Sequence, residues 1–260
     1  MDFDFKPDLP LRDELLRSVE PNVCPVDVAI AVAGIAGSDN VAARVREDIG
    51  FLADSVRSNS IEEVIDRLKS LGFPSDPSFL DDIERNQIDL ALRHKSGNPI
   101  TLAMILAGIA EEIELEYVGI NFPQHFLARI DQRLIDPLQM RIVTSDEMRA
   151  WAKRRRLSSP LFLRASNRDI ALRMLNNVRL ALCICDRPVD ALTVLDYKNL
   201  LAGDRPEILI EKSEVWLDMG DIGMGKALLE QAMDLIDSSS LKEVIRRRVQ
   251  LLSDVDEELN

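Results

Sequence analysis

Few side chains in this sequence could act as nucleophiles, bases or metal ligands. The 260 residues include only two histidines, His94 and His125, and three cysteines, Cys24, Cys183 and Cys185. A catalytic thiol needs a nearby base or a helix N-terminus to form the thiolate, and a zinc site needs several Cys or His ligands at close spacing. The sequence contains no C-x-x-C, H-x-x-x-H or glycine-rich phosphate loop, so we expect no metal and no bound cofactor.

The cysteines are too few and too irregularly spaced for a disulfide framework, and they suit a reducing cytoplasm. Cys24 is predicted to be a small buried apolar residue. Cys183 and Cys185 lie two positions apart in a predicted helix and are expected to be packing residues. His94 precedes Lys95 at a predicted helix end, where positive charge is favourable, and is expected to face solvent.

A turn at residues 96–99 opens the most apolar helix of the sequence. Asn98 is a suitable N-cap, and Pro99 suits the first helical position because the N–H that it lacks would have no partner there. The following residues, through Ile109, are nearly all apolar, so this helix is predicted to be buried. Three short strands are expected to follow, at 117–121, 125–130 and 134–137. One helix and three strands indicate a compact α+β unit.

Helices dominate the rest of the chain. The apolar spacing predicts helices before this unit at 27–36, 40–57, 61–71 and 80–92, and one after it at 145–155. A last helix is predicted at 241–253, followed by a solvated acidic tail at 254–258.

The C-terminal part contains an internal repeat. Four residues recur 34 positions later: Leu175, Leu182, Ala191 and Leu195 correspond to Leu209, Trp216, Gly225 and Leu229. The small residue in the second helix of each pair would let two helices approach closely. The period and the pattern resemble the tetratricopeptide repeat, whose stacked helix pairs bind extended peptides on a concave face.

The net charge of −13 argues against broad binding to nucleic acid or to anionic lipid. The longest apolar runs are about half of the ~20 residues that a bilayer crossing needs, and the first residues are acidic. We therefore expect a cytoplasmic protein that binds neither membranes nor nucleic acid. One basic cluster stands out: Arg149, Lys153, Arg154, Arg155 and Arg156. It is either a solvated helix face or a docking patch for an acidic protein partner, to which Arg154, Arg155 and Arg156 would contribute.

Three segments resemble the transglutaminase-like superfamily, and more closely its bacterial SirB type, in which tetratricopeptide repeats follow the domain. Residues 97–103 (GNPITLA) resemble the turn that opens the central helix of that family. Residues 121–127 (NFPQHFL) resemble its F-P-G-H-F strand, and residues 135–137 (IDP) resemble its I-D-P strand. The order and spacing of the segments are specific, and the likeness extends from about residue 24 onward.

The resemblance implies that a Cys, a His and an Asp would form a catalytic triad in active members. His125 falls on the His position and Asp136 on the Asp position, but Pro99 occupies the Cys position. Proline has no side chain that can attack a substrate. Thr101 and Ser96 are the nearest hydroxyls that could replace the thiol. The fold is therefore implied, whereas acyl-transfer activity is not.

We expect a predominantly helical α+β protein with two parts. Residues 1–160 would form a helical lead-in and a transglutaminase-like, papain-like core, and residues 165–260 a tetratricopeptide-like helical region. The favoured function is a catalytically inactive regulator or adaptor that binds another protein. The alternatives are a hydrolase or acyltransferase that uses His125 and Asp136 with water or an unidentified nucleophile, and a sensor of a peptide or small molecule.

Overall fold

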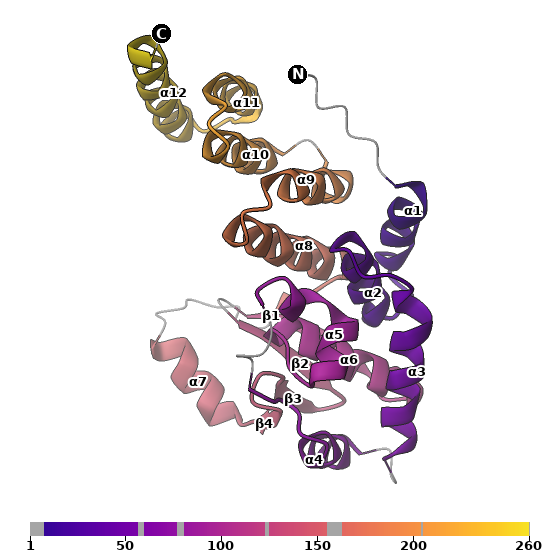
Figure 1. Cartoon of the computed structure of the whole chain (residues 1–260). Coiled ribbons are helices and arrows are strands. Elements are labelled where there is room, and N and C mark those ends of the chain that lie inside the picture. The colour runs from indigo at the N-terminus through magenta and orange to yellow at the C-terminus, as the bar shows by residue number, and fades with distance from the viewer. Residues whose placement is uncertain are drawn as a thin grey trace. The chain divides into compact units, whose positions relative to one another are not determined.

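A computed structural model describes residues 8–56, 60–76, 81–122, 125–154, 163–203 and 205–259. The chain is predominantly helical with one small antiparallel sheet, as the sequence predicts (Figure 1). It divides into two compact units, one formed by residues 8–174 and the other by the residues from 175 onward. The boundary falls within a single helix, α8 (Asn167–Ile184).

The first unit contains seven α-helices before α8 among its described residues. Their bounds are α1 (Leu9–Ser18), α2 (Pro25–Ile35), α3 (Val41–Asp54), α4 (Ile61–Ser70), α5 (Ile88–His94), α6 (Pro99–Glu112) and α7 (Ser145–Arg154). A short 3₁₀ helix, η2 (Glu84–Asn86), precedes α5.

The sheet has five antiparallel strands in the order β4-β3-β2-β1-β5. The strands are β1 (Tyr117–Phe122), β2 (His125–Ile130), β3 (Arg133–Asp136), β4 (Arg141–Val143) and β5 (Leu163–Arg164). Strands β1 to β4 follow one another as hairpin neighbours. The register pairs Phe122 with His125 and Asp136 with Arg141.

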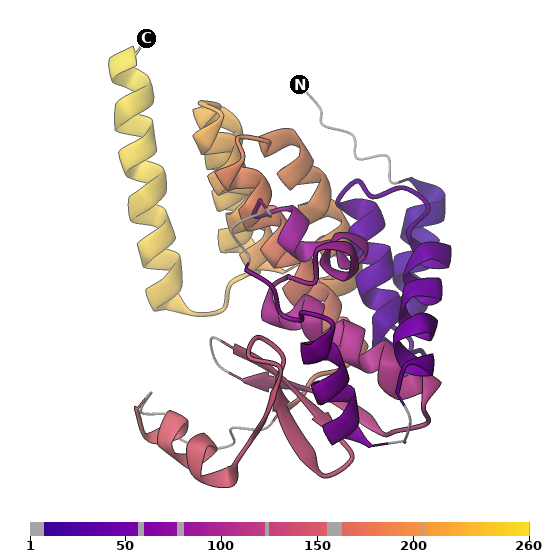
Figure 2. The ribbon, with the colours of Figure 1, turned by 60° about the horizontal axis from the view of Figure 1, so that its bottom comes forward.

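The central helix α6 forms the core of the first unit. The side chain of Asn98 caps it by accepting a hydrogen bond from the amide of Thr101 at 2.9 Å, and Pro99 occupies the first turn. Every residue from Ile100 to Ala110 is buried, as expected for a nearly all-apolar helix. Helices α2, α3 and α5 pack around α6, and α6 also packs on β1 and β2 (Figure 2).

Strand alternation gives the sheet two buried faces. The face toward α7 carries a hydrophobic cluster: Val118, Ile120, Phe122, Leu127, Val143 and Met148. The intervening residues Phe126, Ala128 and Ile130 of β2 are buried on the other face. Side chains therefore cover much of both faces, which explains why β1 and β2 are short runs of mostly apolar residues.

The second unit consists of packed helices. After the last turns of α8 come α9 (Pro188–Ala202), α10 (Pro206–Asp218), α11 (Ile222–Leu235) and α12 (Ser239–Leu259), and α10 contacts α9 and α11. The turn after α8 and the turn after α10 have the same backbone hydrogen bonds 34 residues apart. Arg187 donates its amide to the Leu182 carbonyl and Asp221 to the Trp216 carbonyl, both at 2.9 Å. The residues before these donors, Asp186 and Gly220, both have positive φ. The 34-residue period is thus a repeat of backbone geometry as well as of sequence.

Some elements differ from the sequence-based predictions. The segment 80–92 was expected to be one helix, but it forms η2 and then α5, because Gln87 has an extended backbone with ψ of 116°. Strands β4 and β5 are too short, at three and two residues, to leave a pattern in the sequence. Helix α12 continues to Leu259, through the segment that was predicted to be a solvated tail. Within the described residues, no helix has the combination of length and apolar composition that spanning a membrane would require.

Candidate functional site

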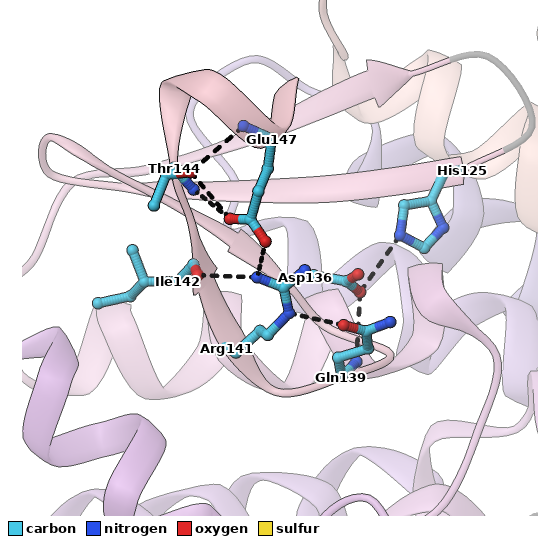
Figure 3. Close-up of polar contacts among 7 residues, drawn as sticks. All are labelled: His125, Asp136, Gln139, Arg141, Ile142, Thr144 and Glu147. Atoms are coloured by element: carbon cyan, nitrogen blue, oxygen red, sulfur yellow. Dashed lines mark hydrogen bonds and ion pairs between the residues drawn. The ribbon is translucent and has the colours of Figure 1, made fainter. Parts of the chain in front are cut away.

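His125 and Asp136 form a contacting pair on one face of the sheet. His125 opens β2 and Asp136 ends β3, and the His125 Nε2 atom lies 3.2 Å from Asp136 Oδ1 (Figure 3). The His125 side chain is 14% exposed and that of Asp136 is 3% exposed. The sheet therefore brings the two side chains together, buries the carboxylate and leaves a small part of the imidazole side chain exposed.

Two further groups hold this pair in place. The Trp151 ring of α7 meets the imidazole edge-on, with 6.0 Å between ring centroids and an interplanar angle of 82°. Asp136 Oδ1 also accepts hydrogen bonds from the amides of Leu138 and Gln139, at 3.0 and 3.2 Å. Burial raises the pKa of Asp136, but the hydrogen bond and charge of His125 and these two amides outweigh it, so the pKa lies below its usual value.

A polar network links the turn after Asp136 to the start of α7 (Figure 3). Arg141 donates to the Gln139 side chain at 2.6 Å and to Glu147 at 2.8 Å. Glu147 in turn accepts hydrogen bonds from the amide and the hydroxyl of Thr144, which lower its pKa and cap the helix. The sequence alone did not identify Arg141, Glu147 or Trp151 as neighbours of the site, although the T-x-x-E spacing at Thr144 is a capping signal.

The turn that opens α6 is well ordered around Pro99. Asn98 accepts hydrogen bonds from both the amide and the hydroxyl of Thr101, and its own amide group donates to Asn86. The backbone amide of Asn98 also donates to the Arg85 carbonyl at 3.1 Å. Pro99 therefore sits in a complete helix N-terminus that is tied to η2.

Comparison of the sequence with models of protein families shows to which family this domain belongs. A family model described as the transglutaminase-like superfamily matches residues 37–176, which is more than half of the chain. The chain belongs to the transglutaminase-like superfamily. The matched range contains Pro99, His125 and Asp136, so all three positions lie inside the family domain.

The relatives are proteins named UPF0162. One from Pseudomonas aeruginosa is 28% identical over 142 residues, which are 52% of this chain and 53% of the relative. One from Xylella fastidiosa, strain Temecula1, is 24% identical over 191 residues, which are 68% of each chain. The chain thus spans about half the length of the Pseudomonas relative and about two thirds of the Xylella relative. No solved structure matches the chain.

The groups that could replace a thiol at position 99 are buried, hydrogen-bonded or held protonated. Thr101 is fully buried and its hydroxyl donates to Asn98 at 3.0 Å. Ser96 is also buried. Cys24, predicted to be buried, is only half-buried because it is the N-cap residue of α2. Its Sγ lies 3.8 Å from the Ala107 carbonyl oxygen, in the second half of α6. Burial raises the pKa of Cys24 to about 12, so its thiol stays protonated at neutral pH.

The remaining candidate residues lie away from the pair. His94 is exposed at the end of α5, as predicted. Cys183 is half-buried in α8, but Cys185 is exposed, which corrects its predicted packing role: it follows the last residue of α8, where the chain turns. No group of three or more Cys, His, Asp or Glu side chains in the described part of the chain is placed to hold a metal ion.

The predicted docking patch is described only in part. Arg149 in α7 is exposed and pairs with Asp146. The backbone of Arg154 is the end of α7, whereas Arg155 and Arg156 lie outside the described residues. A role of this patch in binding a partner stays a prediction.

Proposed function

We propose that this chain is a catalytically inactive member of the transglutaminase-like superfamily that acts by binding another protein, as a regulator or adaptor. The observation that carries the proposal is Pro99 at the first turn of α6, where the family resemblance implies the catalytic thiol. A proline there keeps the helix N-terminus intact and removes the nucleophile.

The surroundings of the His125–Asp136 pair support this proposal. The carboxylate is committed to two backbone amides of its own turn as well as to the imidazole, and Trp151 packs against the imidazole edge. These contacts join β2, β3 and α7, so the histidine can stabilise the packing of these elements without taking part in a reaction. The hydroxyl of Thr101 is buried, and the thiol of Cys24 stays protonated at neutral pH, so neither group meets the requirements of a nucleophile.

The helices of the second unit would bind the partner protein. Their helix pairs share one turn geometry at a period of 34 residues, which supports a tetratricopeptide-like region of the SirB type. Stacked helix pairs of this kind offer a surface for an extended peptide. The free cysteines suit a reducing compartment, so we place the protein in the cytoplasm, and its bacterial relatives favour a bacterial origin.

An activity screen tests the absence of catalysis. The full chain and the His125→Ala variant are incubated with a glutamine-containing protein and an amine donor, with p-nitrophenyl esters and with peptide amides. We expect equal and background-level product release from the two proteins. Steady turnover that is lost in His125→Ala would overturn the proposal.

The alternative function is hydrolysis by activated water. It is favoured by one observation, the 3.2 Å contact between His125 Nε2 and Asp136, which leaves Nδ1 as the nitrogen that could accept a proton. General-base assistance typically contributes ~10²–10⁴-fold, so a further group would be needed to stabilise the transition state. Turnover that falls in both His125→Ala and Asp136→Asn would support this alternative.

A further inference from the structure

A cavity of about 750 Å³ lies on the α7 face of the sheet. Its floor is apolar and consists of side chains from three strands and α7: Ile120, Leu134, Val143 and Met148. This volume falls in the range that binds a small molecule or a few residues of a peptide. The floor belongs to the hydrophobic cluster described above, so it is held in place by the core of the sheet.

The walls of the cavity are strongly basic although the chain carries a net charge of −13. Four arginines line it: Arg129, Arg133, Arg149 and Arg164. No acidic side chain is found among the described residues that line it. Four guanidinium groups above an apolar floor form a site for a ligand that is both anionic and partly apolar.

Arg129 is the most informative of the four. It extends from β2, is half-buried, and has no ion-pair or hydrogen-bond partner for its guanidinium within the described residues. The nitrogens of Arg129 are not among the fully buried, unpartnered atoms of the described residues, so water solvates them and a bound anion could take the place of that water. The charge of Arg129 is therefore available to a ligand.

The other three arginines are paired at the rim of the cavity with carboxylates that do not line it. The pairs are Arg133 with Glu62, Arg149 with Asp146 and Arg164 with Glu116. All of these side chains are exposed, and exposed ion pairs contribute little free energy. A ligand carboxylate can therefore replace the rim partners at small cost.

The cavity is separate from the His125–Asp136 pair. Along β2, His125, Leu127 and Arg129 point to the same face, and Leu127 between them is fully buried. Four residues of strand span about 13 Å. The buried Leu127 would therefore separate a ligand held by Arg129 from the imidazole of His125. The cavity is thus a second site on this face of the sheet.

We infer that this cavity binds a peptide segment of a protein partner in which acidic side chains flank an apolar one. This inference rests on the proposed binding function and names the chemistry of the partner. The apolar side chain would cover the floor, and the carboxylates would pair with Arg129 and the rim arginines. A free phosphate fits less well, because it would leave most of the apolar floor uncovered. A nucleic acid fits less well, because the net negative charge of the chain would repel its backbone.

Fluorescence anisotropy with the full chain tests this inference. The probe is a fluorescein-labelled, end-capped peptide Glu-Glu-Leu-Glu-Glu, and the comparison peptides are Gln-Gln-Leu-Gln-Gln and Glu-Glu-Ser-Glu-Glu. We expect saturable binding of the first peptide that weakens with added salt, and at least about tenfold weaker binding of each comparison peptide. Inorganic phosphate and benzoate are added as competitors, and millimolar concentrations are expected to displace little of the peptide.

Matched variants locate the binding. Arg129→Gln is expected to weaken the peptide about tenfold, because it removes a charge-assisted contact. Arg246→Gln changes the net charge equally on an exposed arginine of α12 and is expected to leave binding unchanged. Arg164→Gln, on the rim, provides a second test should Arg129→Gln lower the melting temperature. Equal effects of Arg129→Gln and Arg246→Gln, an absence of saturable peptide binding, or complete displacement by phosphate would each overturn the inference.

Failure of this inference and failure of the proposed function give different results. The activity screen described above judges the proposed function, and the anisotropy experiment does not depend on it. Background-level turnover together with no peptide binding would reject the cavity and leave the inactive-regulator proposal standing. Turnover that requires His125 would reject the proposed function whatever the cavity binds.

Discussion

Proline is compatible with the first turn of a helix, because the N–H that it lacks would have no partner there. Unlike cysteine, it has no side-chain group that can act as a nucleophile. Pro99 occupies such a turn, which Asn98 caps through the amide and hydroxyl of Thr101. His125 and Asp136 are still in contact at 3.2 Å. At the scale of single residues, His125 and Asp136 are thus in contact, at the positions that the family resemblance implies for the His and Asp of a triad. Pro99, at the position implied for the thiol, cannot act as a nucleophile.

The variant Pro99→Cys is expected to restore a reactive thiol. The helix N-terminus favours the thiolate, so the pKa of this cysteine should lie below the ordinary value of about 8.5. Iodoacetamide labelling at pH 7, followed by mass spectrometry, should modify position 99 faster than the exposed native Cys185. Adding His125→Ala tests the alignment. A lower labelling rate would place the imidazole within reach, and an unchanged rate would contradict the correspondence with the triad.

Replacing Asp136 by asparagine is expected to destabilise the protein in a pH-dependent way. The pKa of Asp136 is lowered in the folded protein, so its carboxylate adds stability above the unfolded value near 3.8 and loses it as the pH falls through the folded pKa. We expect Asp136→Asn to reduce the free energy of unfolding by about 1–2 kcal/mol at pH 5–7. The difference from the native chain should shrink below about pH 4.

Urea denaturation between pH 7 and pH 3.5 measures this effect. Asp146→Asn is the matched control, because that carboxylate is 90% exposed and its ion pair within the described residues is with Arg149 of the same helix. The control should differ little from the native chain at any pH. A pH-independent loss in Asp136→Asn would contradict the charged role of this residue.

At the scale of elements, helices α10 and α11 approach each other closely at a glycine. A Cβ atom on Gly225 would lie 2.5 Å from Cγ and Cδ2 of Leu217, so no side chain fits there without movement. Gly223 lies two residues earlier on the same helix, and a Cβ atom added there would lie 3.6 Å from its nearest neighbour, Oδ1 of Asp221. The small residue that the repeat pattern predicted in the second helix therefore has a packing reason.

The two glycines of α11 should respond oppositely to alanine. Gly223→Ala is expected to stabilise the second unit by up to about 1 kcal/mol, because alanine is the better helix former. Gly225→Ala should lose more than this gain, about 1–3 kcal/mol, because the methyl group overpacks the contact with Leu217. Amide hydrogen exchange in α10 and α11 measures both changes. Equal protection in the two variants would contradict the close approach of the helices.

At the scale of the whole molecule, helix α8 contributes to the first unit before it continues into the second. The side-chain amide of Asn167 donates to the carbonyls of Ser18, Glu20 and Val23 at 2.9–3.1 Å. The guanidinium carbon Cζ of Arg173 lies over the Phe126 ring, 5.6 Å from its centroid. The transglutaminase-like match also extends to residue 176. The early turns of α8 thus complete the packing of the superfamily domain.

A comparison of fragments tests where that domain ends. The division into 1–160 and 165–260 stays a prediction. Because fragment 1–160 lacks the Asn167 and Arg173 contacts, we expect it to melt at a lower temperature than fragment 1–184, which keeps all of α8. Differential scanning calorimetry of the two fragments and the full chain measures this difference. Identical melting temperatures of the two fragments would assign α8 wholly to the repeat region.

The elements that could be predicted from sequence are those whose signal is local. The cap and proline before α6 and the apolar runs of α6, β1 and β2 carry their information within a few residues. The 3₁₀ turn at Glu84–Asn86 was missed although its signal is also local: the Asp81 carboxylate accepts the amides of Ile83 and Glu84 at 2.8 Å. Strand β4 is a three-residue strand that pairs with its neighbour β3, and the two-residue β5 pairs with β1, more than 40 residues earlier in the chain. Neither strand is long enough to show an alternating pattern.

The sequence by itself determined the helical α+β composition, the order of the central helix and the three strands after it, the 34-residue period and the proline at position 99, because each is a property of residue type and spacing. Only the tertiary structure decided which side chains meet. It paired His125 with Asp136, placed Trp151 against the imidazole and gathered four arginines over one apolar floor. These contacts join residues on different strands and helices, and their distances follow from strand register and helix packing.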